Sequence, residues 1–153
     1  MPSFETTRRV KHSASNMFDL VADVERYPEF VPLCETLVVR GRKARPDGTE
    51  ILVADMTVAY KVFRETFTTK VTLNREANEI LVEYLDGPVS ELENKWSFKD
   101  EGEGEGTSDI VFKLDYEFKS RAFAALMGTV FDRAFRRFAE AFEDRADKVY
   151  ASN

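Results

Sequence analysis

The sequence is poor in the residues that crosslink chains or bind soft metals. Its 153 residues include one cysteine, Cys34, and one histidine, His12. A lone cysteine excludes an intramolecular disulfide, and one distant histidine cannot complete a zinc site of thiolate and imidazole ligands. We expect His12 to be a solvated surface imidazole and Cys34 to be a small buried hydrophobic residue. The functional alternatives are a general base at His12 and a pocket-edge position for Cys34.

Long apolar runs and an excess of positive charge are also missing. No run of about 18 apolar residues occurs, and the N-terminal stretch Met-Pro-Ser-Phe-Glu-Thr-Thr-Arg-Arg holds no apolar segment. We therefore expect neither a signal peptide nor a membrane span, but a cytoplasmic protein that is at most peripheral at the inner face of a membrane. Lysine plus arginine number 22 against 28 aspartate plus glutamate, a net charge of −6. This balance argues against DNA as a partner.

Phenylalanine, in contrast, is abundant, with 13 residues in the chain. The hydrophobic fraction is 43% and the charged fraction is 33%, which is typical of a folded protein and, at this length, of a single domain over residues 1–153. So many rings can fill a core, or they can line the wall of a pocket for an apolar ligand.

The hydrophobic pattern predicts a strand, a helix, several strands and a final long helix. Residues 3–11 are typical of a strand, and Ser13 can cap a helix that ends near Tyr27-Pro28. We expect residues 27–34 to form a short helical turn, and strands to follow from Leu37 to about residue 118. Breaks are expected at 46–48, 59–62, 74–78 and 86–88, and at the acidic glycine-rich loop 101–106.

After residue 120 the hydrophobic period changes from two to about 3.6. If residues 121–149 form one helix, it is roughly 44 Å long, enough to cross a sheet. Its apolar stripe consists of Phe123, Met127, Val130, Phe131, Ala134, Phe138 and Phe142. Short connections between strands favour antiparallel pairing, and the sheet's apolar face needs a cover. The sequence therefore predicts an α+β fold in which a curved antiparallel sheet wraps around a long C-terminal helix.

Two polar residues lie among apolar neighbours on the predicted strands. Glu65 and Asn94 either point into a cavity, where they would orient the polar head of a ligand, or lie at strand edges where water reaches them. A pair of carboxylates for acid–base catalysis is not evident.

Three segments resemble the coenzyme Q-binding and ribosome-association toxin branch of the START-like, polyketide cyclase/dehydrase superfamily. The first is 18–34, Phe-Asp-Leu-Val-Ala-Asp-Val-Glu-Arg-Tyr-Pro-Glu-Phe-Val-Pro-Leu-Cys, and the second combines 85–88, Leu-Asp-Gly-Pro, with 96–98, Trp-Ser-Phe. The third is 116–120, Tyr-Glu-Phe-Lys-Ser, with the helix after it. The chain departs from the second motif at Val89, where the family usually has a bulkier residue, and it lacks a glycine at 93–94.

The resemblance implies a helix-grip fold and a carrier or chaperone for ubiquinone, or a related prenyl lipid, in respiration. It leaves two alternatives: a ribosome-association toxin that blocks subunit joining, with the cluster Arg133, Arg136 and Arg137 as its contact, and a polyketide cyclase with Glu65 as its acid or base. No cofactor, metal or catalytic residue is expected. A transient membrane contact and a ribosomal subunit are further candidate partners. The residues that we expect to bind the ligand are Phe30, Val31, Pro32, Tyr60, Phe63, Glu65, Phe67, Asn94, Trp96, Phe98, Phe112, Leu114, Tyr116, Phe123, Met127, Val130 and Phe131.

Overall fold

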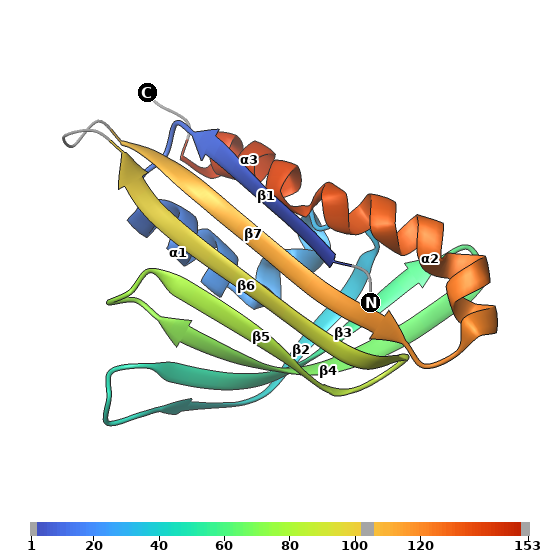
Figure 1. Cartoon of the computed structure of the whole chain (residues 1–153). Helices are drawn as coiled ribbons and strands as arrows, with labels where there is room; N and C mark the ends of the chain where they lie inside the picture. The colour runs from blue at the N-terminus through green and yellow to red at the C-terminus, as the bar shows by residue number, and fades with distance from the viewer. Residues whose placement is uncertain (1–2, 102–105, 151–153) are drawn as a thin grey trace.

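A computed structural model describes residues 3–101 and 106–150, and seven antiparallel strands in it form one curved sheet (Figure 1). The strand order is β1-β7-β6-β5-β4-β3-β2. The strands are β1 Ser3–Val10, β2 Cys34–Ala44, β3 Glu50–Tyr60, β4 Phe63–Asn74, β5 Glu79–Asp86, β6 Val89–Glu101 and β7 Thr107–Phe118. The helices are α1 Ala14–Ala22, the 3₁₀ helix η1 Val24–Glu29, α2 Arg121–Arg136 and α3 Phe138–Val149. The predicted α+β fold is confirmed.

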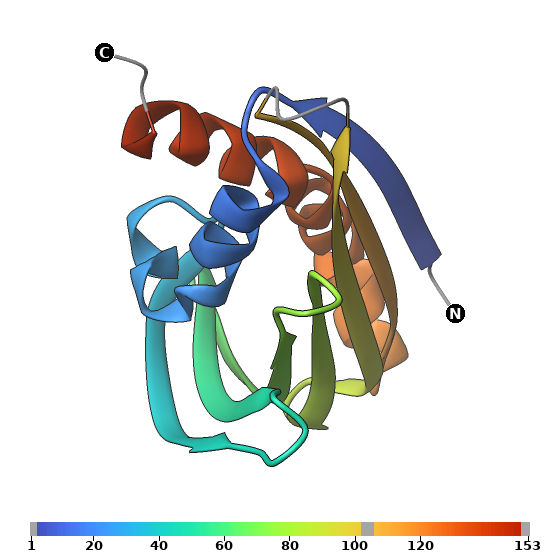
Figure 2. The same ribbon diagram turned by 90° about the vertical axis from the view of Figure 1, so that its left-hand side faces the viewer.

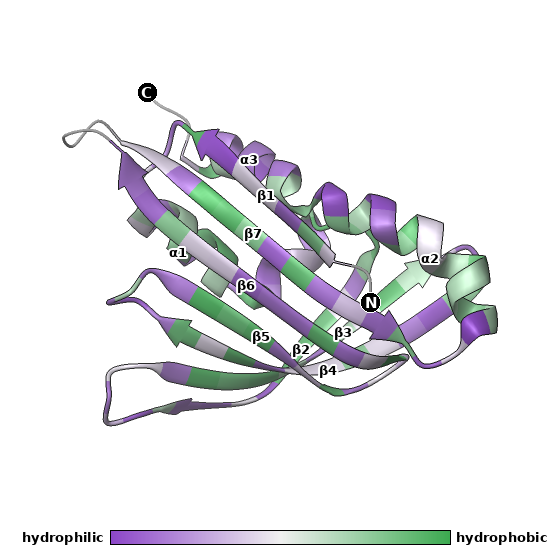
Figure 3. Ribbon diagram, viewed as in Figure 1, coloured by the Kyte–Doolittle hydropathy of each residue, from purple (hydrophilic) through white to green (hydrophobic). Residues whose placement is uncertain are grey.

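The sheet curls so strongly that α1, η1 and α3 close one end of it, as Figure 2 shows. Along β7 buried and less buried residues alternate, and the same alternation of hydropathy is visible in Figure 3. Alternate side chains of a strand point to opposite faces. The apolar side chains of the long strands therefore converge on the inner, concave face, which the two C-terminal helices cover.

The first helix begins as the sequence predicts and ends earlier. The hydroxyl of Ser13 accepts a hydrogen bond from the backbone N–H of Asn16 at 3.1 Å, which caps α1. The helix ends at Ala22, and η1 then carries Tyr27 and Pro28. The tighter 3₁₀ turn thus accommodates a proline that would interrupt an α-helix.

The strand breaks lie where the sequence predicts them. The β3–β4 hairpin turns at Lys61 and Val62 without glycine or proline, because Lys61 itself adopts a φ of 56°. The β5–β6 turn does need its glycine: Gly87 has a φ of 147°, and a Cβ there would lie 2.9 Å from the carbonyl oxygen of Thr66. The centre of the predicted 101–106 loop lies outside the described residues.

The expectation of one unbroken C-terminal helix is wrong. The chain leaves the helical hydrogen-bond ladder at Arg137, which ends α2 and precedes α3. Neither glycine nor proline marks the break. It divides the apolar stripe into two parts that face different regions of the sheet: Phe131 of α2 packs on Phe67, and Phe142 of α3 packs on Trp96. A straight helix could not follow the curved sheet in this way.

Candidate functional site

The buried apolar side chains form two clusters under the C-terminal helices. The α3 cluster, at the end closed by α1 and η1, includes Met17, Val21, Trp96, Phe112 and Phe142. The α2 cluster, at the opposite end, consists of the buried residues Val58, Phe67, Val89, Met127 and Phe131 with partly buried neighbours. The two clusters do not close over the middle of the sheet, and members of both line a cavity between them.

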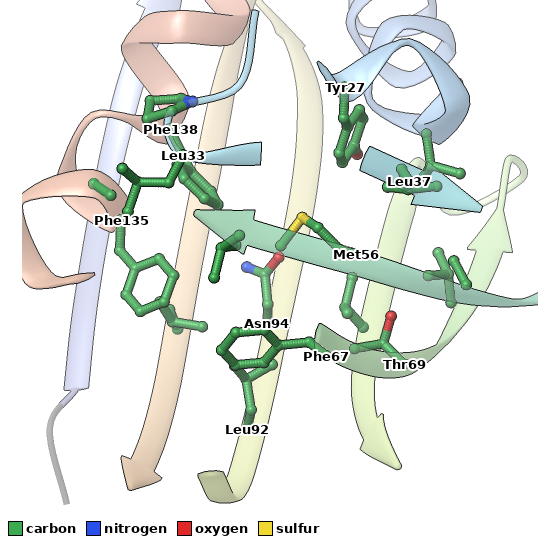
Figure 4. A pocket seen from close by; sticks show the side chains of 18 of the residues that line it. Tyr27, Leu33, Leu37, Met56, Phe67, Thr69, Leu92, Asn94, Phe135 and Phe138 are labelled. Carbon is green, nitrogen blue, oxygen red and sulfur yellow. The ribbon is translucent and has the colours of Figure 1, made fainter. Parts of the chain in front are cut away.

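The cavity lies between the concave face of the sheet and the two C-terminal helices (Figure 4). Its volume is about 100 Å³, although its wall involves many residues of the sheet and the helices. The space is therefore a narrow slot. The sheet side of the slot is lined by Ala54, Met56, Val58, Phe67, Thr69, Val71, Ile80, Val82, Leu92, Asn94, Trp96, Phe112 and Leu114. The opposite side of the slot is lined by Phe131, Ala134, Phe135, Phe138 and Phe142 of the two C-terminal helices. It also includes Val24 and Tyr27 of η1, Pro32 and Leu33 of the loop that follows, and Leu37 of β2.

Few polar side chains reach this slot. The Asn94 side chain donates a hydrogen bond from Nδ2 to the backbone oxygen of Lys113, at 2.9 Å. The Tyr27 hydroxyl donates to the backbone oxygen of Val21, and burial raises the pKa of Tyr27, so its hydroxyl stays protonated. Thr69 on β4 contributes a third polar side chain, a hydroxyl, to the wall of the slot. The rest of the wall is almost entirely apolar, a composition suited to an apolar ligand with one small polar group.

The structure brings part of the predicted set together in the slot. The members that line it are Pro32, Phe67, Asn94, Trp96, Phe112, Leu114 and Phe131. The members that lie outside its wall are Phe30, Val31, Tyr60, Phe63, Glu65, Phe98, Tyr116, Phe123, Met127 and Val130. The sequence pattern identified the correct face of the sheet, but it could not identify the level along each strand at which the cavity opens.

Packing explains the position of the outlying residues. Phe30 contacts Phe142, with ring centroids 4.9 Å apart, and Phe98 is stacked beside Trp96. Tyr116 packs against Phe135. Val31 is buried in the α3 cluster, whereas the α2 cluster takes up Tyr60, Phe63, Phe123, Met127 and Val130. Each of these side chains is packed against neighbours in one of the two clusters.

Glu65 and Asn94, which the sequence could not distinguish, occupy different environments. Asn94 is 9% exposed and faces the slot. Glu65 is half-buried on β4, outside the slot. A cyclase mechanism that relied on Glu65 therefore loses its acid–base group. Among the described residues of the wall there is no carboxylate, imidazole or thiol.

Sequence reasoning missed several residues of the wall. Tyr27 comes from η1, Leu33 comes from the segment between η1 and β2, and Phe135 lies off the predicted helical stripe. Met56 and Val82 were on the apolar side of their predicted strands, and Phe138 and Phe142 were on the stripe. For these four the signal was present, because strand alternation marks Met56 and Val82 and the helical period marks Phe138 and Phe142.

The expectations for His12 and Cys34 have opposite outcomes. Cys34 is buried, as expected, and burial raises the pKa of its thiol to about 11. The expectation that His12 is solvated is wrong. Its side chain is 9% exposed, lies 2.7 Å from a carboxylate oxygen of Asp147 on α3, and packs beside the Tyr150 ring. A polar local sequence did not reveal that α3 covers this strand end.

Two further features bear on the class of site. None of the helices in residues 3–101 and 106–150 is both long and apolar enough to span a membrane. Across that same part of the chain, histidine, cysteine, aspartate and glutamate side chains nowhere gather in groups of three or more that could hold a metal ion.

Comparison with known proteins identifies the family. Residues 10–143 match a family described as "Polyketide cyclase / dehydrase and lipid transport". The ribosome association toxin RatA of Escherichia coli K12 is 31% identical over 152 residues, covering 99% of this chain and 91% of that protein. The mitochondrial coenzyme Q-binding protein COQ10 of Dictyostelium discoideum is 29% identical over 150 residues, covering 97% of this chain and 71% of that protein.

Solved structures confirm the architecture. An 18 kDa protein from Caulobacter crescentus is 28% identical with a TM-score of 0.78, over 99% of this chain and 100% of that one. The Zhui aromatase/cyclase from Streptomyces sp. R1128 has a TM-score of 0.80, over 99% of this chain and 96% of that one, but at 16% identity it shows the fold alone. The predicted resemblance is thus confirmed: this chain belongs to the polyketide cyclase/dehydrase and lipid transport family.

Proposed function

We propose that the protein binds ubiquinone or a related prenyl lipid in the slot and acts as its carrier or chaperone in respiration. The observation that carries this proposal is the unfilled, almost wholly apolar slot between the sheet and the C-terminal helices. A core that served stability alone would close such a space, because unfilled volume forfeits contacts on both sides. The similarity to a coenzyme Q-binding protein over nearly the whole chain supports the same class of ligand.

The wall of the slot suits the two parts of a prenylated ring. Flat aromatic side chains, among them Trp96, Phe112 and Phe138, can pack against a ring or an isoprenoid chain. Asn94 and Thr69 can contact oxygen atoms on a ring head. Because the slot is narrow, a ligand of this size enters only if the wall moves apart.

A lipid carrier must also meet a membrane, and exposed apolar side chains support such a contact. Val62, at the tip of the β3–β4 hairpin, is 93% exposed, and Leu126 on α2 is 64% exposed. The hairpin and the first turns of α2 lie at the same end of the molecule, where Tyr60, Phe63 and Phe123 join one cluster (Figure 1). We propose that this end touches the membrane when the ligand is exchanged.

The test is extraction of the protein purified from its native host, followed by mass spectrometry and by titration with a short-chain ubiquinone. We expect a co-purifying prenyl quinone and saturable binding that quenches the emission of Trp96, the single tryptophan. Replacing Phe138 by glutamate, which places a charge in the wall, should abolish binding, whereas Val38→Glu on exposed β2 should leave it intact. If no prenyl quinone co-purified and none bound saturably, the proposal would be refuted.

A second candidate is a contact with a ribosomal subunit, in line with the relatives named as ribosome association toxins. Arg133 and Arg137 are exposed on the helical cover, and neither makes an ion pair within the described residues. Arg136, between them, is paired with Asp132. Sucrose-gradient profiles after overexpression test this function. Overexpression of the wild-type protein is expected to give fewer monosomes and more free subunits. Overexpression of an Arg133→Ala, Arg137→Ala double variant should leave the profile as it is in cells without overexpression. Unchanged profiles would exclude it.

A further inference from the structure

The Asn94 amide is held in one orientation by the sheet. Asn94 lies in the interior of β6, between Val82 of β5 and Leu114 of β7. Its Nδ2 donates to the backbone oxygen of Lys113 at 2.9 Å. Rotating the amide by half a turn would place two carbonyl oxygens against each other, so the nitrogen must face β7.

This orientation leaves the amide oxygen on the slot side. Figure 4 shows Asn94 with its nitrogen turned away and its oxygen directed toward Met56, across the slot. No described residue donates a hydrogen bond to this Oδ1, which stays accessible from the slot. A ligand that fills the slot displaces water from an acceptor that the protein itself does not satisfy.

Such an acceptor discriminates between ligand heads by their donors. An unpaired buried acceptor is costly, whereas a ligand O–H at the same place restores the hydrogen bond. An oxidised quinone and an aryl ether carry only acceptor oxygens, which would lie against the Asn94 oxygen. A hydroquinone or a phenol carries an O–H. Thr69 does not discriminate in this way, because a hydroxyl can donate or accept.

We propose that the slot selects ring ligands that carry a hydroxyl donor, so that a hydroquinone or phenol binds in preference to the corresponding quinone or ether, with Asn94 Oδ1 as the selecting acceptor. This inference rests on the proposed binding of an apolar ring lipid in the slot. Preferential binding of the reduced form also makes the bound quinone easier to reduce, by about 30 mV for each tenfold difference in affinity.

The experiment compares 4-heptylphenol with 4-heptylanisole, two probes that share the ring and tail and differ in the O–H. Binding is measured by calorimetry and by Trp96 emission. In the wild type we expect the phenol to bind about three- to tenfold more tightly than the ether, as one neutral hydrogen bond provides. Asn94→Leu should remove this ratio, and Thr69→Val, the isosteric control on β4, should retain it.

The outcomes separate this inference from the proposed function. If neither probe binds the wild type, the apolar site itself is refuted, and the inference falls with it. If both probes bind equally, or the ether binds more tightly, the site stands and the donor selection is refuted. If the phenol-to-ether affinity ratio persisted in a folded Asn94→Leu or Asn94→Met variant, another group would accept the hydrogen bond from the phenol hydroxyl. That result would overturn the role of Asn94.

Discussion

The two halves of the helical cover are held to the molecule by different forces. Helix α3 inserts Phe142 among three rings, with centroid distances of 5.2 Å to Tyr27, 4.9 Å to Phe30 and 5.0 Å to Trp96. Helix α2 lays Met127 and Phe131 on the sheet beside a slot that no side chain fills. Both halves border the slot, but the rings around Phe142 lie closer to it than the rings around Phe131 lie to Phe131, with centroid distances of 4.9–5.2 Å against 5.5–6.1 Å.

Polar contacts reinforce the difference. From α3, Arg145 pairs with Glu29, and the Tyr150 hydroxyl just beyond the helix donates to the backbone oxygen of Asn16. Glu143 pairs with Arg8 and Asp147 with His12, so β1 and the residues that follow it are also tied to this helix. Helix α2 has a cap at Ser120 and an internal Arg136–Asp132 pair, but no ion pair from its described residues to the sheet. Arg136 also lies over the Phe4 ring.

This contrast indicates how a narrow slot can admit a larger ligand. Helix α3 acts as the anchor of the cover, since moving it would break both ring packing and ion pairs. We expect α2 to move at lower cost, because its apolar contacts have no directional requirement and its described residues make no ion pair to the sheet. Because the helical hydrogen-bond ladder is interrupted at Arg137, we expect this motion to leave α3 in place.

The largest effect is expected at the anchor. Phe142→Ala should lower the free energy of unfolding by about 3–5 kcal/mol, because the ring is 1% exposed and packs closely against three other rings. Urea denaturation followed by circular dichroism measures the change. A loss below about 1 kcal/mol would mean that the α3 end is not the better packed half.

The matching truncation of a phenylalanine side chain in α2 should lower the free energy of unfolding by a smaller amount. Phe131→Ala is expected to lower the free energy of unfolding by about 2 kcal/mol, because its ring neighbours lie farther away, with centroids at 5.5–6.1 Å. Leu126→Ala, at an exposed position of the same helix, is the control and should change stability by less than about 0.5 kcal/mol. If Phe131→Ala cost as much as Phe142→Ala, the two halves would be equivalent.

The turn beneath α2 should be sensitive to a single methyl group. Gly87→Ala is expected to destabilise the protein by about 1–3 kcal/mol, because the backbone must leave a positive φ and the new Cβ meets Thr66. Chemical denaturation measures it, with Gly48→Ala as the control, since that glycine also has a positive φ but open space around it. Equal losses in both variants would attribute the effect to φ alone.

The smallest effect is expected from the surface pair that ties α3 to η1. Hydrogen bonds from Arg145 and Arg26 hold the pKa of Glu29 below its usual range. A carboxyl pKa that is lower in the folded state stabilises the protein above the unfolded-state pKa, and this contribution is lost as the pH falls through the folded pKa. Glu29→Gln should be slightly less stable than wild type at pH 7, and the difference should disappear as the pH falls below the folded pKa of Glu29. A difference that persists at the lowest pH at which both proteins stay folded would contradict this assignment.

The chain's own pattern was sufficient for most of the elements and for the face of the sheet that lines the slot. Alternation along the strands and the stripe after residue 120 predicted the sheet and its cover, since these periods follow from local backbone geometry. The cap at Ser13 and the breaks at 59–62 and 86–88 were predicted as well, because they depend on neighbouring residues.

The three-dimensional packing settled three things that no local pattern carries. The stripe runs through Arg137 without a change of period, so the break there follows from the curvature of a sheet built from distant segments. The burial of His12 depends on Asp147 and Tyr150, more than 130 residues away in the chain. Asn94 and Glu65 occupy similar patterns in sequence, yet only Asn94 lies at the level where the sheet and the helices separate. Periodicity indicates the face of the strand or helix on which a side chain lies. Whether that side chain lines a cavity or packs in the core depends on how closely the opposing elements approach each other at that point.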